Sequence, residues 1–358
     1  MRPIARICVA TASAIALGCG ITAPTATADD MSPKEIFEKV APATVQVLGS
    51  LGSGTGIIYN ADEGLILTNA HVVAGETALK VRIEDGNPVP VRLLGSDPCE
   101  DLAVLKLATP QEDLKQVEFG DSRDLKQGDE VTAIGYPEAA GDASNQKAVL
   151  TSGVVQSPDV AETGNVSLPD LPSTVQHSAT LNPGNSGGPL LNDEAKLVGI
   201  NDSAAGGEIQ NQNYAISSNH AEPLLQGLAD GKSKNNPGWQ SLVALTDPNF
   251  ADYFPDELQA DAQSLQKRLV DKKIDGLVVL GVDSNSPASA AKLEAGDVIT
   301  DLKGTPVTTV PEVCNILQSS APGEKLKVSG VFTVAGTDVN GTPVKVGDPW
   351  EIDVTLAE

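Results

Sequence analysis

The sequence predicts a mainly β protein, in which a β-barrel or sandwich is followed by a small α+β domain. Its 358 residues exceed one ordinary domain and suit two. Short apolar runs, separated by glycine-rich turns, recur between residues 44 and 216, which is typical of a barrel or sandwich. Residues 231–238 have the composition of a flexible linker. We therefore expect a first domain over residues 29–230 and a second over residues 239–358.

The elements of the first domain follow from local patterns. A short helix is predicted over residues 32–40, because Ser32 suits the N-cap, Pro33 the first helical position and Glu35 the capping box. A helix over residues 218–229 closes the domain. The predicted strands are 44–48, 56–59, 65–68, 79–83, 89–94, 102–107, 130–134, 150–156, 174–176, 197–201 and 212–216.

Two polar segments rich in Gly, Pro and Asp, residues 137–146 and 157–173, are expected to be long surface loops. The second domain is expected to be a small α+β domain. Helices are expected around residues 255–270 and near 311–319, and strands at 276–282, 326–334 and 350–356, with further short segments at 240–245, 288–292 and 296–299.

The N-terminus has the pattern of an export signal. Two arginines precede an apolar stretch over residues 7–21, and Ala26 and Ala28 form a small-residue cleavage site before Asp29. We expect cleavage after residue 28, because the apolar stretch is shorter than the ~20 residues of a spanning helix. An uncleaved membrane anchor is the alternative, and Leu17-Gly18-Cys19 hints weakly at lipid attachment to Cys19.

The net charge argues against nucleic-acid binding. Removing residues 1–28 takes away two of the 24 basic side chains and none of the 48 acidic ones, which leaves a formal charge of −26. Such a chain repels nucleic acid and anionic lipid. Cys99 and Cys314 remain after cleavage and could pair in an oxidising compartment, although the sequence does not establish their distance. No metal-ligand spacing is present, and no metal is expected.

The stretch Asn182-Pro183-Gly184-Asn185-Ser186-Gly187-Gly188-Pro189 is the strongest candidate for chemistry. Glycines flank Ser186 on both sides, so the main chain can turn sharply there and expose the hydroxyl. The amides of Gly184 and Ser186 could converge on a developing oxyanion. Read alone, the stretch is equally consistent with a surface turn.

Two upstream motifs supply what a nucleophilic serine needs. Leu67-Thr68-Asn69-Ala70-His71 places a histidine at the end of an apolar strand, and Asp101 directly precedes the run Leu102-Ala103-Val104-Leu105. A histidine can take the proton of a serine hydroxyl, and a buried carboxylate fixes the imidazole tautomer. The chain order His, Asp, Ser is the order used by β-barrels of the chymotrypsin type.

With these motifs, the chain resembles the HtrA (DegP/DegQ/DegS-like) serine endopeptidases. Further matching segments run in order along residues 33–223. They are Gly52-Ser53-Gly54-Thr55-Gly56, Phe119-Gly120-Asp121-Ser122, Ala133-Ile134-Gly135-Tyr136-Pro137, Leu150-Thr151-Ser152-Gly153 and Asn213-Tyr214-Ala215-Ile216. The resemblance implies a chymotrypsin-like double β-barrel followed by a PDZ domain.

The resemblance also implies roles for individual residues. Ser186 is expected to be the nucleophile, His71 the general base and then acid, and Asp101 the orienting carboxylate, with Gly184 and Ser186 forming the oxyanion hole. Glu100 would point away from His71, because adjacent residues of an extended chain face opposite sides. His177 and His220 are expected to be surface or structural residues.

Substrate contacts are expected at Leu181, in a pocket for small or medium aliphatic side chains, and along Asn201, Asp202 and Ser203, which should pair with the substrate backbone. The chain departs from the family pattern at His177-Ser178, where a Thr-Asp pair is usual, and at Asp202, where threonine or another small residue is usual. An acid at position 202 is expected to alter subsite preference or to reduce activity.

The second domain resembles an HtrA-type PDZ domain through Gly276-Leu277-Val278-Val279-Leu280 and Leu293-Glu294-Ala295-Gly296-Asp297. Such a domain binds a C-terminal peptide as an added strand and holds its carboxylate on backbone amides. The carboxylate loop should include Trp239, Gln240, Ser241 and Leu242, although the expected hydrophobic pattern is missing there. A spacer or packing domain is the alternative.

Together these features predict an exported serine endopeptidase of the periplasm, cell envelope or extracellular space. It would cleave unfolded or damaged polypeptides without a cofactor and bind C-terminal peptides, as part of protein quality control. A homotrimer is consistent with the resemblance. The alternative is a weakly active or inactive envelope chaperone or PDZ adaptor on the same fold.

Overall fold

The computed structural model describes residues 30–50, 52–138, 146–204, 211–232, 235–338 and 341–356. The expected export signal, residues 1–28, and most of the expected loop over residues 137–146 lie outside the described residues. None of the helices among the described residues is long and apolar enough to cross a membrane.

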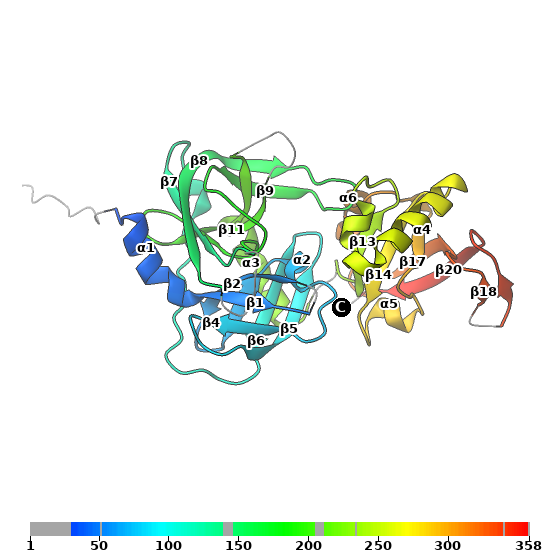
Figure 1. Cartoon of the computed structure of the whole chain (residues 1–358), viewed down its shortest axis with the longest axis horizontal. Helices are drawn as coiled ribbons and strands as arrows, with labels where there is room; N and C mark the ends of the chain where they lie inside the picture. The colour runs from blue at the N-terminus through cyan, green and yellow to red at the C-terminus, as the bar shows by residue number, and fades with distance from the viewer. Residues whose placement is uncertain are drawn as a thin grey trace, which may run out of the picture. The chain divides into compact units, whose positions relative to one another are not determined.

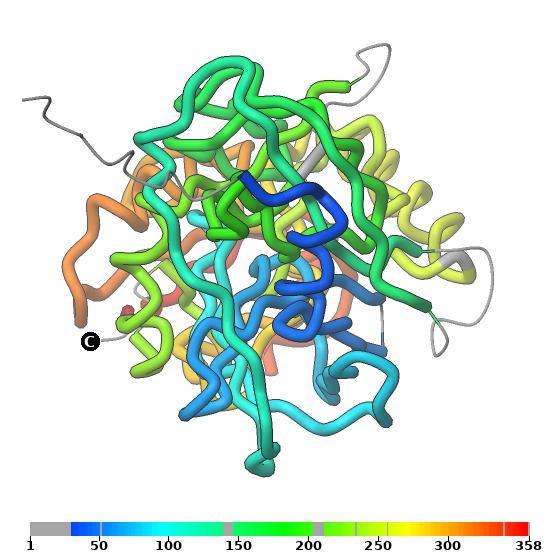
Figure 2. The backbone as a smooth tube through the Cα atoms, turned by 90° about the vertical axis from the view of Figure 1, so that its left-hand side faces the viewer, coloured from blue at the N-terminus to red at the C-terminus, as the bar shows by residue number. Residues whose placement is uncertain are grey.

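The first helix, α1 (Pro33–Val40), begins as its sequence predicts. The Ser32 hydroxyl accepts from the amide of Glu35, and the Glu35 carboxylate accepts from the amide of Ser32. Ile36 and Val40 are buried on one side of the helix. This side packs near the strands β7 (Glu130–Gly135) and β8 (Val149–Glu162), which the helix contacts (Figure 2).

The first domain consists of two closed antiparallel β-barrels (Figure 1). The strand order of the first barrel is β1-β2-β3-β6-β5-β4. Its strands are β1 (Thr44–Leu48), β2 (Ser53–Asn60), β3 (Leu65–Thr68), β4 (Lys80–Ile83), β5 (Val89–Asp97) and β6 (Leu102–Leu107). A cluster of buried aliphatic side chains fills this barrel, among them Val45, Val47, Ile58, Ile66 and Leu105. The aliphatic composition therefore suffices for the core.

The second barrel has the strand order β10-β11-β12-β9-β8-β7. Besides β7 and β8 it contains β9 (Leu171–His177), β10 (Pro189–Leu191), β11 (Leu197–Ala204) and β12 (Asn213–Ser217). The prediction of one long loop over residues 157–173 was wrong. The strand β8 continues to Glu162 and pairs with β9 through several register shifts, so polar residues that suggested a loop lie in a twisted two-stranded ribbon.

Another cluster of buried side chains joins the two barrels to the helices α1 and α3 (Ser218–Ala229). It includes Ile57 and Val104 of the first barrel, Ile200 of the second, and Leu225 of α3. Because α3 contacts strands of both barrels, it helps to fix the angle between them. The catalytic residues predicted from the sequence come from both barrels, so this packing positions the site.

Among the described residues, the second domain contains an antiparallel sheet of order β13-β14-β15-β17-β20, with β16 paired to β15, and three α-helices. The prediction of a small α+β domain is confirmed. The strands are β13 (Trp239–Ala244), β14 (Leu277–Val282), β15 (Val298–Leu302), β16 (Thr305–Pro306), β17 (Lys325–Val331) and β20 (Pro349–Thr355). The helices are α4 (Gln259–Asp271), α5 (Pro287–Ala290) and α6 (Val310–Ser319). A separate hairpin is formed by β18 (Gly336–Thr337) and β19 (Pro343–Val344).

The main core of the second domain also receives side chains from the first. Cys99 is buried within it, and Val166 packs against it from the segment between β8 and β9. The amide of Val310, at the start of α6, donates to the Val166 carbonyl, and the amide of Ala244 in β13 donates to Ser167 Oγ. The segment of residues 163–170 thus lies against β13 and α6.

Candidate active site

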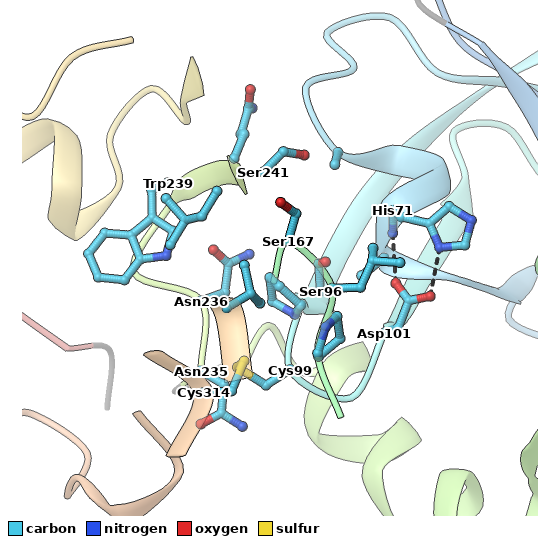
Figure 3. A pocket seen from close by; sticks show the side chains of 18 of the residues that line it. His71, Ser96, Cys99, Asp101, Ser167, Asn235, Asn236, Trp239, Ser241 and Cys314 are labelled. Atoms are coloured by element: carbon cyan, nitrogen blue, oxygen red, sulfur yellow. Dashed lines mark hydrogen bonds and ion pairs between the residues drawn. A yellow bond between two sulfur atoms is a disulfide. The ribbon is translucent and has the colours of Figure 1, made fainter. Parts of the chain in front are cut away.

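His71 and Asp101 come together in the first barrel, as the sequence predicts. His71 lies on the short helix α2 (Ala70–Val73) after β3, and Asp101 lies in the turn between β5 and β6. Asp101 Oδ2 is 2.7 Å from His71 Nδ1, and Asp101 Oδ1 accepts from the main-chain amide of His71 at 2.9 Å (Figure 3). The carboxylate therefore fixes both the ring and the main chain of His71.

The surroundings of this pair set the basicity of the imidazole. Desolvation opposes the charged form, but the negative charge of Asp101 and its hydrogen bond outweigh that cost, so the pKa of His71 is raised. Asp101 is buried, whereas the side chain of His71 is 45% exposed and open to a substrate. This combination suits a general base that is held on one side and reachable on the other.

The turn that carries Asp101 is unusual. Asp101 has a φ of 47°, in the left-handed region that a non-glycine residue adopts rarely. Asn69 Nδ2 donates to the Asp101 carbonyl at 2.9 Å and helps to hold this conformation. Glu100, the neighbouring acid, points elsewhere: its Oε2 is 2.7 Å from Nε2 of His220. The prediction that Glu100 does not face His71 is confirmed.

Ser186 lies in the turn before β10, and its main chain is fixed by both barrels. The Ser186 carbonyl accepts from the amide of Thr55 in β2, and the amide of Gly187 donates to the carbonyl of Asn201 in β11. Ser186 Oγ donates to the main-chain carbonyl of Asp202 at 3.0 Å. Within the described part of the chain, no hydrogen bond joins Ser186 Oγ to His71, so the hydroxyl has to turn before it can transfer its proton.

The geometry around Gly184 is compatible with an oxyanion hole. The Pro183 carbonyl accepts from the amide of Glu138 at 2.7 Å. Because the N–H and C=O of one peptide unit point in opposite directions, the Gly184 amide points away from Glu138. Gly184 has a φ of 95°, and a Cβ atom there would lie 2.4 Å from the Tyr136 carbonyl oxygen, so this position requires glycine.

Thr55 is a supporting residue that the sequence did not single out. Its Oγ1 donates to the Gly184 carbonyl at 2.7 Å and accepts from the amide of Tyr136 at 2.9 Å. Thr68 Oγ1 in turn donates to the Thr55 carbonyl. The signal was present in the glycine-rich run of residues 52–56, but the run alone does not show which hydroxyl is buried against the serine turn.

The residues predicted to contact substrate have different surroundings. Leu181 is 8% exposed and packs in the core of the second barrel. Asn201 is fully buried, and its Nδ2 donates to the Pro189 carbonyl, so its side chain supports the serine turn. The side chain of Ser203 is outside the described part of the structure. Substrate contact at these positions stays a prediction.

Asp202 is displaced from the regular strand. The pairing of β11 with β12 shifts between Asn201 and Ser203, which face Ala215 and Tyr214, so Asp202 is the extra residue of a β-bulge. Its side chain is 10% exposed, and its Oδ1 lies 3.8 Å from His71 Nδ1. Desolvation and the nearby charge of Asp101 raise the pKa of Asp202 well above its usual range.

One group of described residues has ligand atoms within 4.8 Å of one another, which is close enough to hold a metal ion. It consists of His71, Asp101 and Asp202. We assign no metal to this group. The Nδ1–Oδ2 contact of 2.7 Å is that of a hydrogen bond, and a metal bound to Nδ1 would displace the proton through which Asp101 orients the imidazole.

The other two histidines have structural surroundings, as expected. His177 in β9 is fully buried, and burial lowers its pKa to about 4. His220 in α3 pairs with Glu100, mainly through a hydrogen bond that raises the pKa of His220. Among the described residues, no hydrogen bond joins either histidine to Ser186 Oγ, which donates to the Asp202 carbonyl.

Cys99 and Cys314 form a disulfide, which answers the question that their spacing left open. Cys99 lies in the turn before Asp101, and Cys314 lies in α6 of the second domain. Two further contacts join the same turn to the second half of the chain. Asn235 Nδ2 donates to Asp97 Oδ2 at 2.8 Å, and Gln318 Nε2 donates to Glu100 Oε1 at 3.2 Å.

The predicted carboxylate loop is in fact a strand. The strand β13 contains all four residues, Trp239, Gln240, Ser241 and Leu242. It pairs with β14 from Trp239, which lies opposite Val282. These four residues help to line a cavity of about 550 Å³ that also reaches His71, Asp101 and Asp202 (Figure 3). Capture of a carboxylate by these residues stays a prediction.

Comparison with known proteins supports this architecture. Residues 54–200 match the model of a trypsin-like peptidase domain, and residues 258–330 match that of a PDZ domain. The chain is 36% identical over 274 residues to the serine protease Do-like HtrA of Bacillus subtilis, covering 75% of this chain and 58% of that protein. It is 31% identical over 308 residues to the periplasmic pH-dependent serine endoprotease DegQ of Escherichia coli, covering 85% of this chain and 59% of that protein.

Solved structures give the same result. The HtrA-type protease AlgW with a tripeptide has a TM-score of 0.50 and 28% identity, and the match covers 91% of this chain and 97% of that one. AlgW with a decapeptide has a TM-score of 0.50 and 25% identity, with 92% and 99% covered. The two barrels and the sheet that follows them agree with these relatives, two of which are named serine proteases and two HtrA-type proteases. The chain is thus similar to the HtrA serine proteases, and it has a trypsin-like peptidase domain followed by a PDZ domain.

Proposed function

We propose that this chain is an exported serine endopeptidase that hydrolyses peptide bonds of unfolded or damaged proteins. His71, Asp101 and Ser186 form its catalytic triad. The observation that carries the proposal is the buried carboxylate of Asp101, which accepts from both the ring and the main chain of His71. A histidine held in this way is suited to take a proton on its other ring nitrogen.

In the proposed reaction, Ser186 Oγ leaves the Asp202 carbonyl and attacks the scissile carbonyl carbon while His71 Nε2 takes its proton. Asp101 stabilises the imidazolium that results. The amides of Gly184 and Ser186 donate to the oxyanion, where the loss of one donor typically costs about 3 kcal/mol of transition-state stabilisation. His71 then protonates the leaving amine, and water hydrolyses the acyl-enzyme by the reverse sequence. This mechanism uses no cofactor.

The PDZ domain would recognise C-terminal peptides of substrates or partners. Its strand β13 is at the edge of the sheet, where an extended peptide can add by β-augmentation. The amide of Ala244 on this strand already donates to Ser167 Oγ. A peptide that used this amide would therefore have to displace the segment of residues 163–170.

Export agrees with the disulfide. Disulfides persist in oxidising compartments and are rare in the bacterial cytosol. The bond between Cys99 and Cys314 therefore favours a periplasmic, envelope or extracellular location, and the DegQ relative is named as periplasmic. The chain spans less than two thirds of that relative, so this location belongs to the proposal. A homotrimer stays a prediction that light scattering of the purified protein can test.

The competing function is a weakly active or inactive envelope chaperone or adaptor. The hydrogen bond from Ser186 Oγ to the Asp202 carbonyl favours it, because a hydroxyl bound there is not bound to its base. In substrate-free proteases such catalytic hydrogen bonds are often long and form only with substrate. Direct measurement of turnover distinguishes the two functions.

The test uses residues 29–358, the Ser186→Ala variant and, as a matched control, Ser319→Ala on the exposed face of α6. Each protein is treated with an active-site-directed fluorophosphonate and with unfolded casein. We expect the wild type and Ser319→Ala to be labelled and to cut, and Ser186→Ala to lose turnover by about 10⁶-fold. Absence of labelling and cutting in the wild type would refute the enzyme and leave the adaptor. Labelling without casein cleavage would refute broad action on unfolded proteins.

A further inference from the structure

The β-bulge at Asp202 brings an additional acid to the catalytic pair. In a regular strand, residue 202 would face away from its neighbours 201 and 203, and the bulge changes this direction. As a result, one residue lies beside all three members of the proposed triad. The Asp202 main-chain carbonyl accepts from Ser186 Oγ, and its carboxyl group lies beside His71 Nδ1 and Asp101.

The two carboxyl groups share one small space: an oxygen of Asp101, an oxygen of Asp202 and a ring nitrogen of His71 all lie within 4.8 Å of one another. A hydrogen bond between two carboxyl groups requires a proton on one of them, because an ionised carboxylate has only acceptor atoms. Asp101 already accepts two N–H groups from His71, one on each oxygen. Among the described residues, no N–H donates to the Asp202 carboxyl group at hydrogen-bond distance, so a proton shared by the two acids belongs on Asp202.

We propose that Asp202 is a positioning residue of the catalytic centre: its carboxyl group stays protonated and donates a hydrogen bond to Asp101, which holds that carboxylate against His71. This inference rests on the proposed protease function. The chain thus uses a protonated acid at the place where the family resemblance leads one to expect threonine or another small residue.

The charges around Asp202 favour the protonated form. Three titratable groups act on it: Asp101 from the β5–β6 turn, Glu162 from the end of β8 and His71 from α2. Among the described residues that line the adjoining cavity, none is Lys or Arg. Burial is the largest cause of the raised pKa of Asp202, followed by the nearby carboxylate of Asp101 and then by the charge of Glu162.

Ionisation of Asp202 would disable the triad. A second negative charge beside Asp101 repels that carboxylate and removes the donor that holds it. The same charge, 3.8 Å from His71 Nδ1, favours the imidazolium and so occupies the general base with a proton. Turnover should therefore fall on the alkaline side as Asp202 loses its proton, and the three groups titrate as a coupled unit.

The first experiment compares the dependence of kcat/KM on pH for the wild type, Asp202→Asn, Glu162→Gln and a surface control, Glu38→Gln on α1. Asparagine keeps a donor toward Asp101 but cannot ionise. We expect Asp202→Asn to stay within about fivefold of the wild type at the wild-type optimum and to lack the alkaline limb, along which kcat/KM falls about tenfold per pH unit.

Glu162→Gln should move the alkaline limb to lower pH, because removal of a negative charge lowers the pKa of Asp202, while Glu38→Gln should leave the profile unchanged. The proposal is overturned if the profiles of Asp202→Asn and the wild type coincide. It is equally overturned if Asp202→Asn loses activity more than about 100-fold at every pH, since an ionised carboxylate would then be required.

The second experiment does not depend on turnover, so it separates this inference from the proposed function. Aspartate ¹³C-carboxyl resonances are followed with pH in the Ser186→Ala protein and in the Ser186→Ala/Asp202→Asn double variant. We expect a resonance, distinct from that of Asp97, that titrates well above the usual aspartate range and that disappears in the double variant. If no such resonance is lost, Asp202 does not hold the proton, whether or not the wild type cleaves peptides.

Discussion

The disulfide between Cys99 and Cys314 gives the sharpest prediction for stability. The bond closes a chain segment with a sequence separation of 215 residues. In the chain-entropy model, opening a loop of this length restores about 18 cal/mol/K to the unfolded chain, or about 5 kcal/mol at 25 °C. Native disulfides typically contribute ~2–5 kcal/mol, so we expect the Cys99→Ala/Cys314→Ala variant to lose several kcal/mol of unfolding free energy.

The remaining contacts indicate where this loss should appear. Without the bond, the turn before Asp101 is still joined to the second half of the chain by the hydrogen bonds Asn235–Asp97 and Gln318–Glu100. Each is worth only about 1 kcal/mol net. The contact between the β5–β6 turn and α6 should therefore loosen before either domain core unfolds.

The assay is guanidinium chloride unfolding of the wild type and the double alanine variant, each with and without dithiothreitol. We expect reductant to lower the wild-type midpoint to that of the variant, and to leave the variant unchanged. Because Cys99 lies two residues before Asp101, peptide turnover should fall in parallel. Equal midpoints for the oxidised wild type and the variant would refute the reasoning, since the cross-link would then contribute nothing.

Three further predictions concern single positions. Gly184→Ala should lower kcat for a peptide substrate about 10²–10³-fold, because φ at this residue is 95° and the added Cβ would lie 2.4 Å from the Tyr136 carbonyl oxygen. A variant with the wild-type kcat would refute the assignment of Gly184 to the oxyanion hole. Burial raises the pKa of Asp97 to about 6, so the folded state favours its protonated form. The wild type should therefore lose about 2 kcal/mol relative to Asp97→Asn as urea unfolding is repeated from pH 4 to pH 6. Burial lowers the pKa of His177 to about 4, so the unfolding free energy of the wild type should fall by about 3 kcal/mol relative to that of His177→Gln as the pH falls from about 6.5 to 4. If the two proteins show the same dependence of unfolding free energy on pH, His177 is not a buried neutral histidine.

Much of the fold could be predicted because its signals are local. The capping box at Ser32 and Glu35 fixes the start of α1, and the helix over residues 218–229 is found with the predicted bounds. The pairing of His71 with Asp101 could be predicted from the sequence, because each residue adjoins a short apolar strand and the two follow the expected chain order.

The features that the sequence did not reveal depend on register and on distant contacts. Residues 157–162 look like a loop because they are polar, but pairing with β9 makes them a strand. The side-chain direction of Asp202 reverses through one extra residue in β11, which no local pattern specifies. The bond between Cys99 and Cys314 depends on a packing arrangement between segments more than 200 residues apart.

Asp101, the proposed catalytic aspartate, shows how these contacts act together. A non-glycine residue at a φ of 47° carries backbone strain of about 1–3 kcal/mol, and such strain persists only where the surroundings determine the conformation. Asn69 fixes the carbonyl of Asp101, and His71 fixes its carboxylate from the first barrel. Two residues earlier, Cys99 fixes the same turn covalently to α6. The orientation of Asp101 is therefore supported from both domains, and a change that frees the turn should reduce catalysis even where the triad residues themselves are intact.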